Sequence, residues 1–137
     1  MLKKLTILML LVGSLISVQA QEKKHQLSSH ILDVSQGLPA PNVLIKLEKQ
    51  LEKDTWQFIA ENKTDQNGRI QDFLPYEAND VNAGIYRLTY YTKTYFESLN
   101  QSSFYPFIEV VFEIKDTQHY HVPITLSPYG YSTYRGN

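Results

Sequence analysis

The sequence predicts an all-β fold, an antiparallel β-sandwich with one short helix. Apolar and polar residues alternate with a period of two in many short segments, which is the pattern of strands with one buried face. Turn-forming residues separate these segments at intervals of roughly 8–12 residues. Only one segment has the pattern of a helix, and no repeat or second domain is evident.

Residues 1–20 have the pattern of a secretory signal peptide and are set apart from this fold. Lys3 and Lys4 form a basic start, an apolar run follows, and small residues precede a cleavage position after Ala20. The alternative is a membrane anchor, but the apolar run is shorter than the ~20 residues that a spanning helix needs. We therefore expect export to the periplasm and a folded domain over residues 21–137.

The charge and the cysteine content of the chain exclude several classes of function. The chain has 13 Lys and Arg residues against 14 Asp and Glu residues, and removal of Lys3 and Lys4 leaves a net charge of about −3. Neither nucleic acid nor an anionic membrane surface is an expected partner of such a domain. There is no cysteine, so no disulfide stabilises the fold and no thiol nucleophile exists. The core, or an oligomer interface, must therefore supply the stability.

The first half of the domain predicts four strands. His30 lies in the middle of the first strand. In the third strand one face is formed by Trp56, Phe58 and Ala60, which alternate with Gln57, Ile59 and Glu61. An Asn-Gly pair readily supplies positive φ and predicts a turn before Arg69, which begins the fourth strand. The predicted strands cover residues 27–34, 43–48, 56–61 and 69–73.

The second half predicts the helix and four more strands. Residues 94–100 are the helical segment, with Thr94 as the cap and Glu97 three residues later, as in a capping box. Tyr86, Leu88 and Tyr90 form the apolar face of the strand that precedes the helix. The predicted strands cover residues 84–92, 107–114, 119–126 and 129–135.

The strand over residues 119–126 contains two histidines that face away from the core. Side chains two residues apart share a face, so His119, His121 and Pro123 lie opposite the apolar set that begins with Tyr120 and Val122. His121 therefore points to solvent or to another subunit. Because proline cannot donate to a ladder, we expect this strand to lie near an edge or to be locally irregular.

Several kinds of site are compatible with these residues. The simplest alternative is that the histidines are solvated surface residues. A second is a metal site at His119 and His121 with His30 as third ligand, although no carboxylate has a recognised ligand spacing. A serine elbow and a phosphate-binding glycine loop are absent from the sequence. A site of histidine and arginine remains, which suits hydrolysis of a small, polar, carbonyl-rich molecule.

Motifs along the whole domain resemble the transthyretin-like family. The most specific is the ending, which contains Tyr134-Arg135-Gly136 and is similar to that of the family's hydroxyisourate hydrolases. The segments that carry the resemblance are residues 27–33, 37–40, 64–69, 95–96, 104–106, 119–123 and 127–136.

The resemblance implies a hydrolase of purine catabolism that works as a homotetramer with no cofactor and no bound metal. Its substrate would be 5-hydroxyisourate, whose six-membered ring is opened to a ureidoimidazoline carboxylate. The family's catalytic positions fall on His30, Arg69 and His121. Its substrate-binding positions fall on His30, Arg69, Tyr134, Arg135 and Asn137.

One position departs from the family, and two rival functions are open. The family usually ends in serine, whereas this chain ends in Asn137, so we expect the terminal carboxylate rather than a hydroxyl to act. The first rival is a carrier of a hydrophobic ligand, as in transthyretin itself, which should lack the histidine–arginine set and the Tyr134-Arg135-Gly136 ending. The second is an adhesive or scaffolding sandwich, which would have no use for a tyrosine-rich end.

Overall fold

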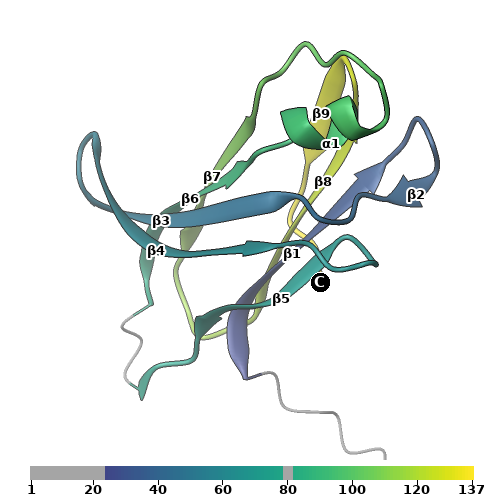
Figure 1. Cartoon of the computed structure of the whole chain (residues 1–137). Coiled ribbons are helices and arrows are strands. Elements are labelled where there is room, and N and C mark those ends of the chain that lie inside the picture. Colours follow the sequence, from purple (N-terminus) through teal and green to yellow (C-terminus); the bar gives the residue numbers. More distant parts are fainter. Residues whose placement is uncertain (1–23, 79–81) are drawn as a thin grey trace, which may run out of the picture.

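The computed structural model describes residues 24–78 and 82–137, which form a sandwich of two β-sheets with one short helix (Figure 1). The predicted signal peptide lies outside the described residues. The described part of the chain contains no helix that is long and apolar enough to cross a membrane. The elements are β1 (His25–Asp33), β2 (Leu38–Pro39), β3 (Leu44–Glu52), β4 (Thr55–Lys63), β5 (Arg69–Pro75), β6 (Gly84–Tyr90), α1 (Lys93–Ser98), β7 (Ile108–Ile114), β8 (Tyr120–Ser127) and β9 (Gly130–Thr133).

The first sheet has the order β2-β1-β8-β9, and β5 also pairs with β1. Strands β1 and β8 are parallel, with Leu27 opposite Tyr120 and Asp33 opposite Leu126. The predicted β-sandwich is confirmed, but its pairing is therefore not antiparallel throughout. The whole second sheet lies between β1 and β8 in the sequence, so no hairpin constrains these two strands to run in opposite directions.

The second sheet has the order β4-β3-β6-β7, and its neighbouring strands are antiparallel. The predicted apolar faces of β6 and β8 are buried between the sheets, which confirms the period-2 assignment. The largest fully buried side chains are those of Leu27, Ile31, Ile45, Leu47, Phe73, Tyr86, Leu88, Tyr90, Phe96, Ile114, Ile124 and Leu126.

Two local predictions were wrong. The pairing of β3 with β4 shifts between Leu47 and Glu48, and this bulge turns Phe58 to solvent with 57% exposure while Ile59 packs against the core. The helix begins earlier than predicted, so its N-cap is Thr92, whose side chain makes no capping hydrogen bond. Thr94 lies inside the helix and cannot serve as the cap.

Strand β8 is an inner strand rather than an edge, but its ladder to β9 is irregular at Pro123. Strand β9 pairs with β8 from Ile124 onward, and an isolated bridge joins His121 to Gly136. Pro123 lies between these two contacts, where its missing N–H is tolerated. The Thr133 hydroxyl donates to the Pro123 carbonyl at 2.9 Å, which keeps the end of the chain against β8.

Candidate active site

The candidate active site lies on the outer face of the first sheet. On β1, the core-facing side chains alternate with Ser28 and His30, which face outward. The pairing places His121 of β8 opposite Ser28 and Arg69 of β5 opposite His30. Paired residues share a face, so three strands bring these four side chains to one surface although they are distant in the sequence.

A hollow of about 720 Å³ opens on this face. Its wall contains two cations, Lys24 and Arg69, and two carboxylates, those of Asp72 and of the C-terminal residue Asn137, so charges of both signs are available to a polar ligand. Figure 1 shows the C-terminus beside β1 and β5, and Asn137 lines the hollow. The lining residues are Lys24, His25, Ser28, Ser29, Arg69, Gln71, Asp72, His119, His121 and Asn137.

Two histidines meet at one serine in the wall of this hollow. The Ser28 Oγ lies 2.7 Å from His121 Nδ1 and 2.9 Å from His119 Nε2. The His119 Nδ1 lies 2.9 Å from the His25 carbonyl oxygen. Ser28 is buried and the two imidazoles are half-buried, so the hydroxyl fixes the orientation of both rings.

A buried cluster beneath the hollow supports these side chains. The Ser29 hydroxyl donates to the Val122 carbonyl at 2.8 Å and lies 2.9 Å from the Tyr90 hydroxyl. The Tyr90 hydroxyl donates to the same carbonyl at 3.2 Å. Burial raises the pKa of Tyr90 above its usual range, so this phenol stays neutral and connects β1, β6 and β8.

His30 lies next to the hollow but is not part of its lining. Burial lowers the pKa of His30 from 6.5, the positive charge of Arg69 lowers it further, and the Asn67 backbone and the charge of Asp65 oppose the change. His30 is therefore mainly neutral at pH 7. The structure places it against Arg69 and the turn before β5, and its predicted catalytic role stays a prediction.

The turn before β5 holds Arg69 in place. The Asp65 carboxylate accepts from the Asn67 and Arg69 backbone N–H groups at 2.8 and 2.9 Å. Gly68 has φ +70°, and a Cβ there would lie 2.6 Å from the Ile31 carbonyl oxygen. Only glycine fits this approach, so the Asn-Gly turn fixes the start of β5 against β1 and leaves the Arg69 side chain exposed.

The end of the chain packs against His121. The Gly136 N–H donates to the His121 carbonyl at 2.9 Å. A Cβ on Gly136 would overlap the imidazole carbons of His121, with its Cγ at 3.2 Å. The glycine of the Tyr134-Arg135-Gly136 ending is thus required by the ring that it covers, and it brings Asn137 to the hollow.

Tyr134 and Arg135 lie away from the hollow, although they were predicted to bind substrate. The Arg135 guanidinium lies 4.8 Å from the centre of the Tyr120 ring and donates to Gln118 Oε1 at 3.2 Å. Both residues line a second depression, which lies between β7 and β8. Within one copy of the chain, the structure therefore does not bring them to the hollow, and their substrate-binding role stays a prediction.

Sequence reasoning missed Ser28. The available signal was its position two residues before His30, which puts both side chains on one face of β1.

The described residues contain no group of three or more His, Cys, Asp or Glu side chains placed to bind a metal ion. The alternative of a metal held by His30, His119 and His121 therefore has no support in the geometry.

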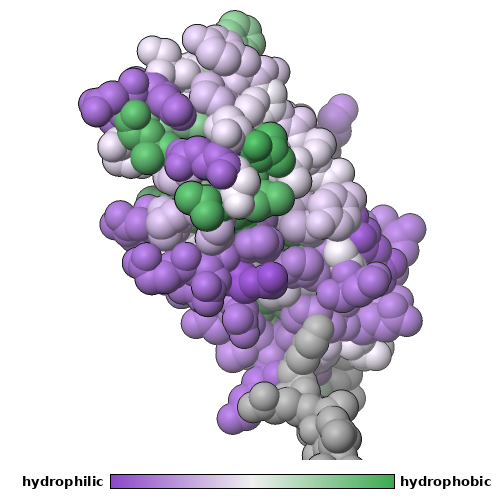
Figure 2. All heavy atoms as spheres, turned by 90° about the vertical axis from the view of Figure 1, so that its right-hand side faces the viewer, coloured by the Kyte–Doolittle hydropathy of each residue, from purple (hydrophilic) through white to green (hydrophobic). Residues whose placement is uncertain are grey.

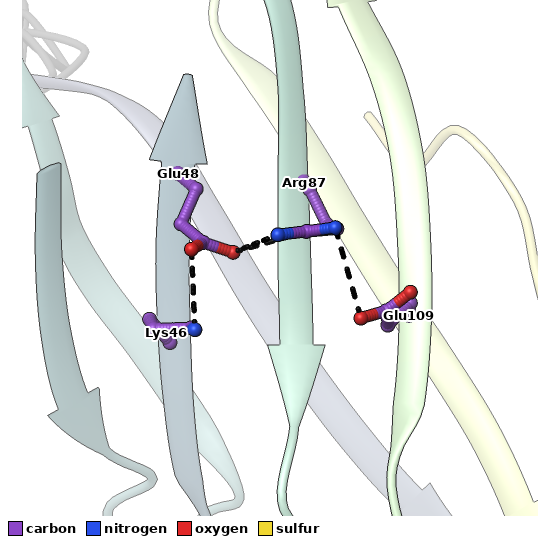
Figure 3. A network of polar contacts seen from close by, with 4 residues as sticks. All are labelled: Lys46, Glu48, Arg87 and Glu109. Carbon is purple, nitrogen blue, oxygen red and sulfur yellow. Dashed lines mark hydrogen bonds and ion pairs between the residues drawn. The ribbon is translucent and has the colours of Figure 1, made fainter. Parts of the chain in front are cut away.

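A second polar cluster lies on the outer face of the second sheet, and it consists of ion pairs (Figure 3). Glu48 contacts Arg87 at 2.8 Å and Lys46 at 3.2 Å, and Arg87 also approaches Glu109 at 3.9 Å. The Arg87 guanidinium lies 4.3 Å from the centre of the Trp56 ring. Burial acts to raise the pKa of Glu48, but the hydrogen bonds from Arg87 and Lys46 outweigh it and leave the pKa lowered.

Comparison with known proteins places this chain in a family. The model of the HIUase/Transthyretin family matches residues 27–136. The chain belongs to the HIUase/Transthyretin family. A probable 5-hydroxyisourate hydrolase of Caenorhabditis elegans is 49% identical over 112 residues, which are 81% of each chain. The 5-hydroxyisourate hydrolase of Salmonella dublin is 47% identical over 112 residues, which are 81% of this chain and 80% of that protein.

Solved structures of the family include both an enzyme and a binding protein. The 5-hydroxyisourate hydrolase of Klebsiella pneumoniae superposes with a TM-score of 0.67 at 33% identity, over 84% of this chain and 95% of that one. A sea bream transthyretin in complex with thyroxine superposes with a TM-score of 0.73 at 31% identity, over 81% of this chain and 94% of that one. The backbone fold alone therefore does not separate hydrolase from carrier, whereas the relatives of 47–49% identity are named as hydrolases.

Proposed function

We propose that this protein hydrolyses 5-hydroxyisourate. The observation that carries the proposal is the hollow that His121 and Arg69 line together, in a chain whose similar relatives are named 5-hydroxyisourate hydrolases. A carrier of an apolar ligand has no need of a proton acceptor beside a guanidinium. The carrier alternative is therefore the weaker one.

His121 and Arg69 have separate roles in the proposed reaction. The His121 imidazole accepts a proton from water, and the water oxygen forms a bond to a carbonyl carbon of the six-membered ring. Arg69 stabilises the negative charge that develops on the carbonyl oxygen. The ring C–N bond then breaks, and His121 returns the proton to the leaving nitrogen. The product is 2-oxo-4-hydroxy-4-carboxy-5-ureidoimidazoline.

The residues around this pair position the substrate. His30 is neutral and lies opposite Arg69, next to the hollow rather than in its lining, so its proposed role in orienting the attacking water requires its ring to turn towards the hollow. The Asn137 carboxylate and side chain close one side of the hollow. Tyr134 and Arg135 bind substrate only if a second copy of the chain brings them to a shared site.

We also propose that the active form is a homotetramer. Apolar side chains are exposed near the β1–β2 and β8–β9 turns, which lie at the same end of the sandwich because β1 and β8 are parallel. Phe104 is 70% and Tyr129 is 72% exposed, and Val34 and Leu38 are each 55% exposed. Figure 2 shows strongly apolar side chains gathered on this side of the molecule above a hydrophilic region. Burial of such a surface by other copies would be favourable.

Export is proposed from the sequence of residues 1–20. The basic start and the apolar run favour secretion and removal of this segment, which places the domain in the periplasm. N-terminal sequencing of the protein isolated from the periplasm tests this: we expect a start at Gln21. A chain that retains Met1 and sediments with the membrane fraction would contradict it.

A spectroscopic assay with freshly generated 5-hydroxyisourate tests the activity. Purified protein should accelerate the decay of the substrate absorbance, and exhaustive chelation should leave the rate unchanged, because the proposed chemistry uses only side chains. Decay at the uncatalysed rate would overturn the proposed function. Loss of activity on chelation and recovery with zinc would instead show that a metal takes part.

A further inference from the structure

We propose that Ser28 and His119 are positioning residues that hold His121 in the tautomer with its proton on Nδ1, so that Nε2 is the basic nitrogen. The proposal deepens the proposed function and rests on it for its catalytic meaning. It is carried by the chain of contacts from the His25 carbonyl through His119 and Ser28 to His121.

The donor and acceptor roles along these contacts are set at the His25 end. The His25 carbonyl oxygen accepts hydrogen bonds and cannot donate one. The His119 Nδ1, at 2.9 Å from that oxygen, must therefore carry the proton of the neutral ring. A neutral imidazole has one N–H, so the His119 Nε2 is an acceptor.

The same reasoning passes through Ser28 to His121. The hydroxyl has one proton, and the acceptor at His119 Nε2, 2.9 Å away, takes it. Towards His121 Nδ1, at 2.7 Å, the Ser28 oxygen is then an acceptor. The neutral His121 therefore carries its proton on Nδ1 and has its lone pair on Nε2.

This arrangement serves the proposed reaction at both protonation states of His121. When Nε2 takes a proton from water, the ring becomes a cation whose Nδ1–H still donates to Ser28 Oγ. When the proton passes to the leaving nitrogen, the ring returns to the same neutral tautomer. Ser28 and His119 exchange no proton in the cycle, and their effect is to keep the base correctly protonated and oriented.

Nitrogen NMR of protein labelled with ¹⁵N-histidine tests the tautomer without any substrate. At a pH of about 8, where histidines of ordinary pKa are neutral, His121 should show a protonated Nδ1 and an unprotonated Nε2. A His121 ring with its proton on Nε2 would overturn the proposal. Because the measurement uses no substrate, its result is independent of whether the protein hydrolyses 5-hydroxyisourate.

Variants test the catalytic part. Ser28→Ala removes the acceptor at Nδ1, and His119→Phe leaves the Ser28 hydroxyl proton to be donated to His121 Nδ1. Both should shift His121 towards the other tautomer and lower kcat at least ~10-fold, since a wrong tautomer disables a histidine base that is still in place. KM should change less than about 3-fold, because the ring remains in the hollow.

Two further variants separate positioning from folding. Ser28→Thr keeps a hydroxyl at this place and should restore both the tautomer and most of kcat. Ser132→Ala removes another hydroxyl from the first sheet, one that pairs with Thr125 at 2.7 Å in an exposed position, and should change neither. Wild-type turnover in folded Ser28→Ala would overturn the positioning role, as would failure of Ser28→Thr to exceed Ser28→Ala.

Discussion

The outer face of the second sheet neutralises its charges in pairs, whereas the outer face of the first sheet keeps neutral hydrogen-bonded groups beside the exposed Arg69. Around Glu48 the carboxylate is matched by Lys46 and Arg87. Around Ser28 the partners are two imidazoles, which contact its hydroxyl rather than a charged group.

The difference shows which polar surface is suited to chemistry. Hydrogen bonds from Arg87 and Lys46 hold the pKa of Glu48 down against the effect of burial, so this group keeps one charge state at any physiological pH. The histidines of the first sheet face a hollow with room for a small molecule. The ion pairs therefore stabilise the second sheet, whereas the proposed proton acceptor, His121, lies on the first sheet.

The largest expected effect is loss of catalysis on the first sheet. His121→Ala and Arg69→Ala should each lower the hydrolysis rate at least ~100-fold, the usual scale for removal of an acid–base or oxyanion group. Neither side chain lies on a core face, so folding should survive. Steady-state kinetics and circular dichroism check this together, and near-normal turnover in either folded variant would refute the role assigned to that residue.

The matching change on the second sheet should affect stability instead. Arg87→Ala leaves Glu48 buried without its main hydrogen-bond donor and removes the contact with Trp56. We expect the free energy of unfolding to fall by about 2 kcal/mol, with turnover per folded molecule unchanged.

Urea unfolding measures this change, and an exposed ion pair provides the control. Lys115 and Glu113 lie 3.4 Å apart with both side chains more than half exposed. Lys115→Ala should therefore cost less than ~0.5 kcal/mol. Equal losses in the two variants would show that burial of Glu48 does not matter.

A smaller effect should follow from crowding His121. In Gly136→Ala the added methyl group meets the His121 ring, so the ring moves and kcat should fall on the order of 10-fold. Gly130→Ala, at the start of β9, is a matched control, since its Cβ would find only Ser127 Oγ at 3.8 Å. A comparison of kcat for the two variants checks this, and equal values would contradict the contact.

The smallest effect concerns the pH dependence of stability. The folded protein lowers the pKa of His30 below 6.5, so on acidification the unfolded chain takes up this proton first. The contribution of neutral His30 to the free energy of unfolding is complete above pH 6.5. It is lost as the pH falls towards the pKa that His30 has in the folded protein. Urea unfolding at several pH values should show a weaker loss of stability on acidification in His30→Gln than in wild type. An identical pH dependence in the two proteins would show that folding does not lower the pKa of His30.

The sequence predicted the faces of the strands well because burial follows a local period. Tyr86, Leu88 and Tyr90 are buried as their alternation requires. Phe58 was placed on the wrong face because a bulge inserts one residue into β4, and nothing in the local pattern marks the insertion. The helix start was misplaced because the helix begins after Thr92, which makes no side-chain capping hydrogen bond, so no capping motif marks the start.

The site was predictable only in part. The family resemblance pointed to His30, Arg69 and His121, and the pairing of β1 with β5 and β8 brings these strands together. The spacing of Ser28 from His30 indicates only that the two side chains share a face, because the partners of Ser28 come from the parallel register of β1 with β8. That same register sets Ser28 opposite His121.

The most direct test of catalysis on the first sheet is a crystal structure of the protein with urate, a stable relative of the proposed substrate. We expect urate in the hollow, with an oxygen within hydrogen-bond reach of the Arg69 guanidinium and the ring facing His121 Nε2. Urate bound elsewhere on the molecule, with water alone between His121 and Arg69, would contradict the assignment of this face as the active site.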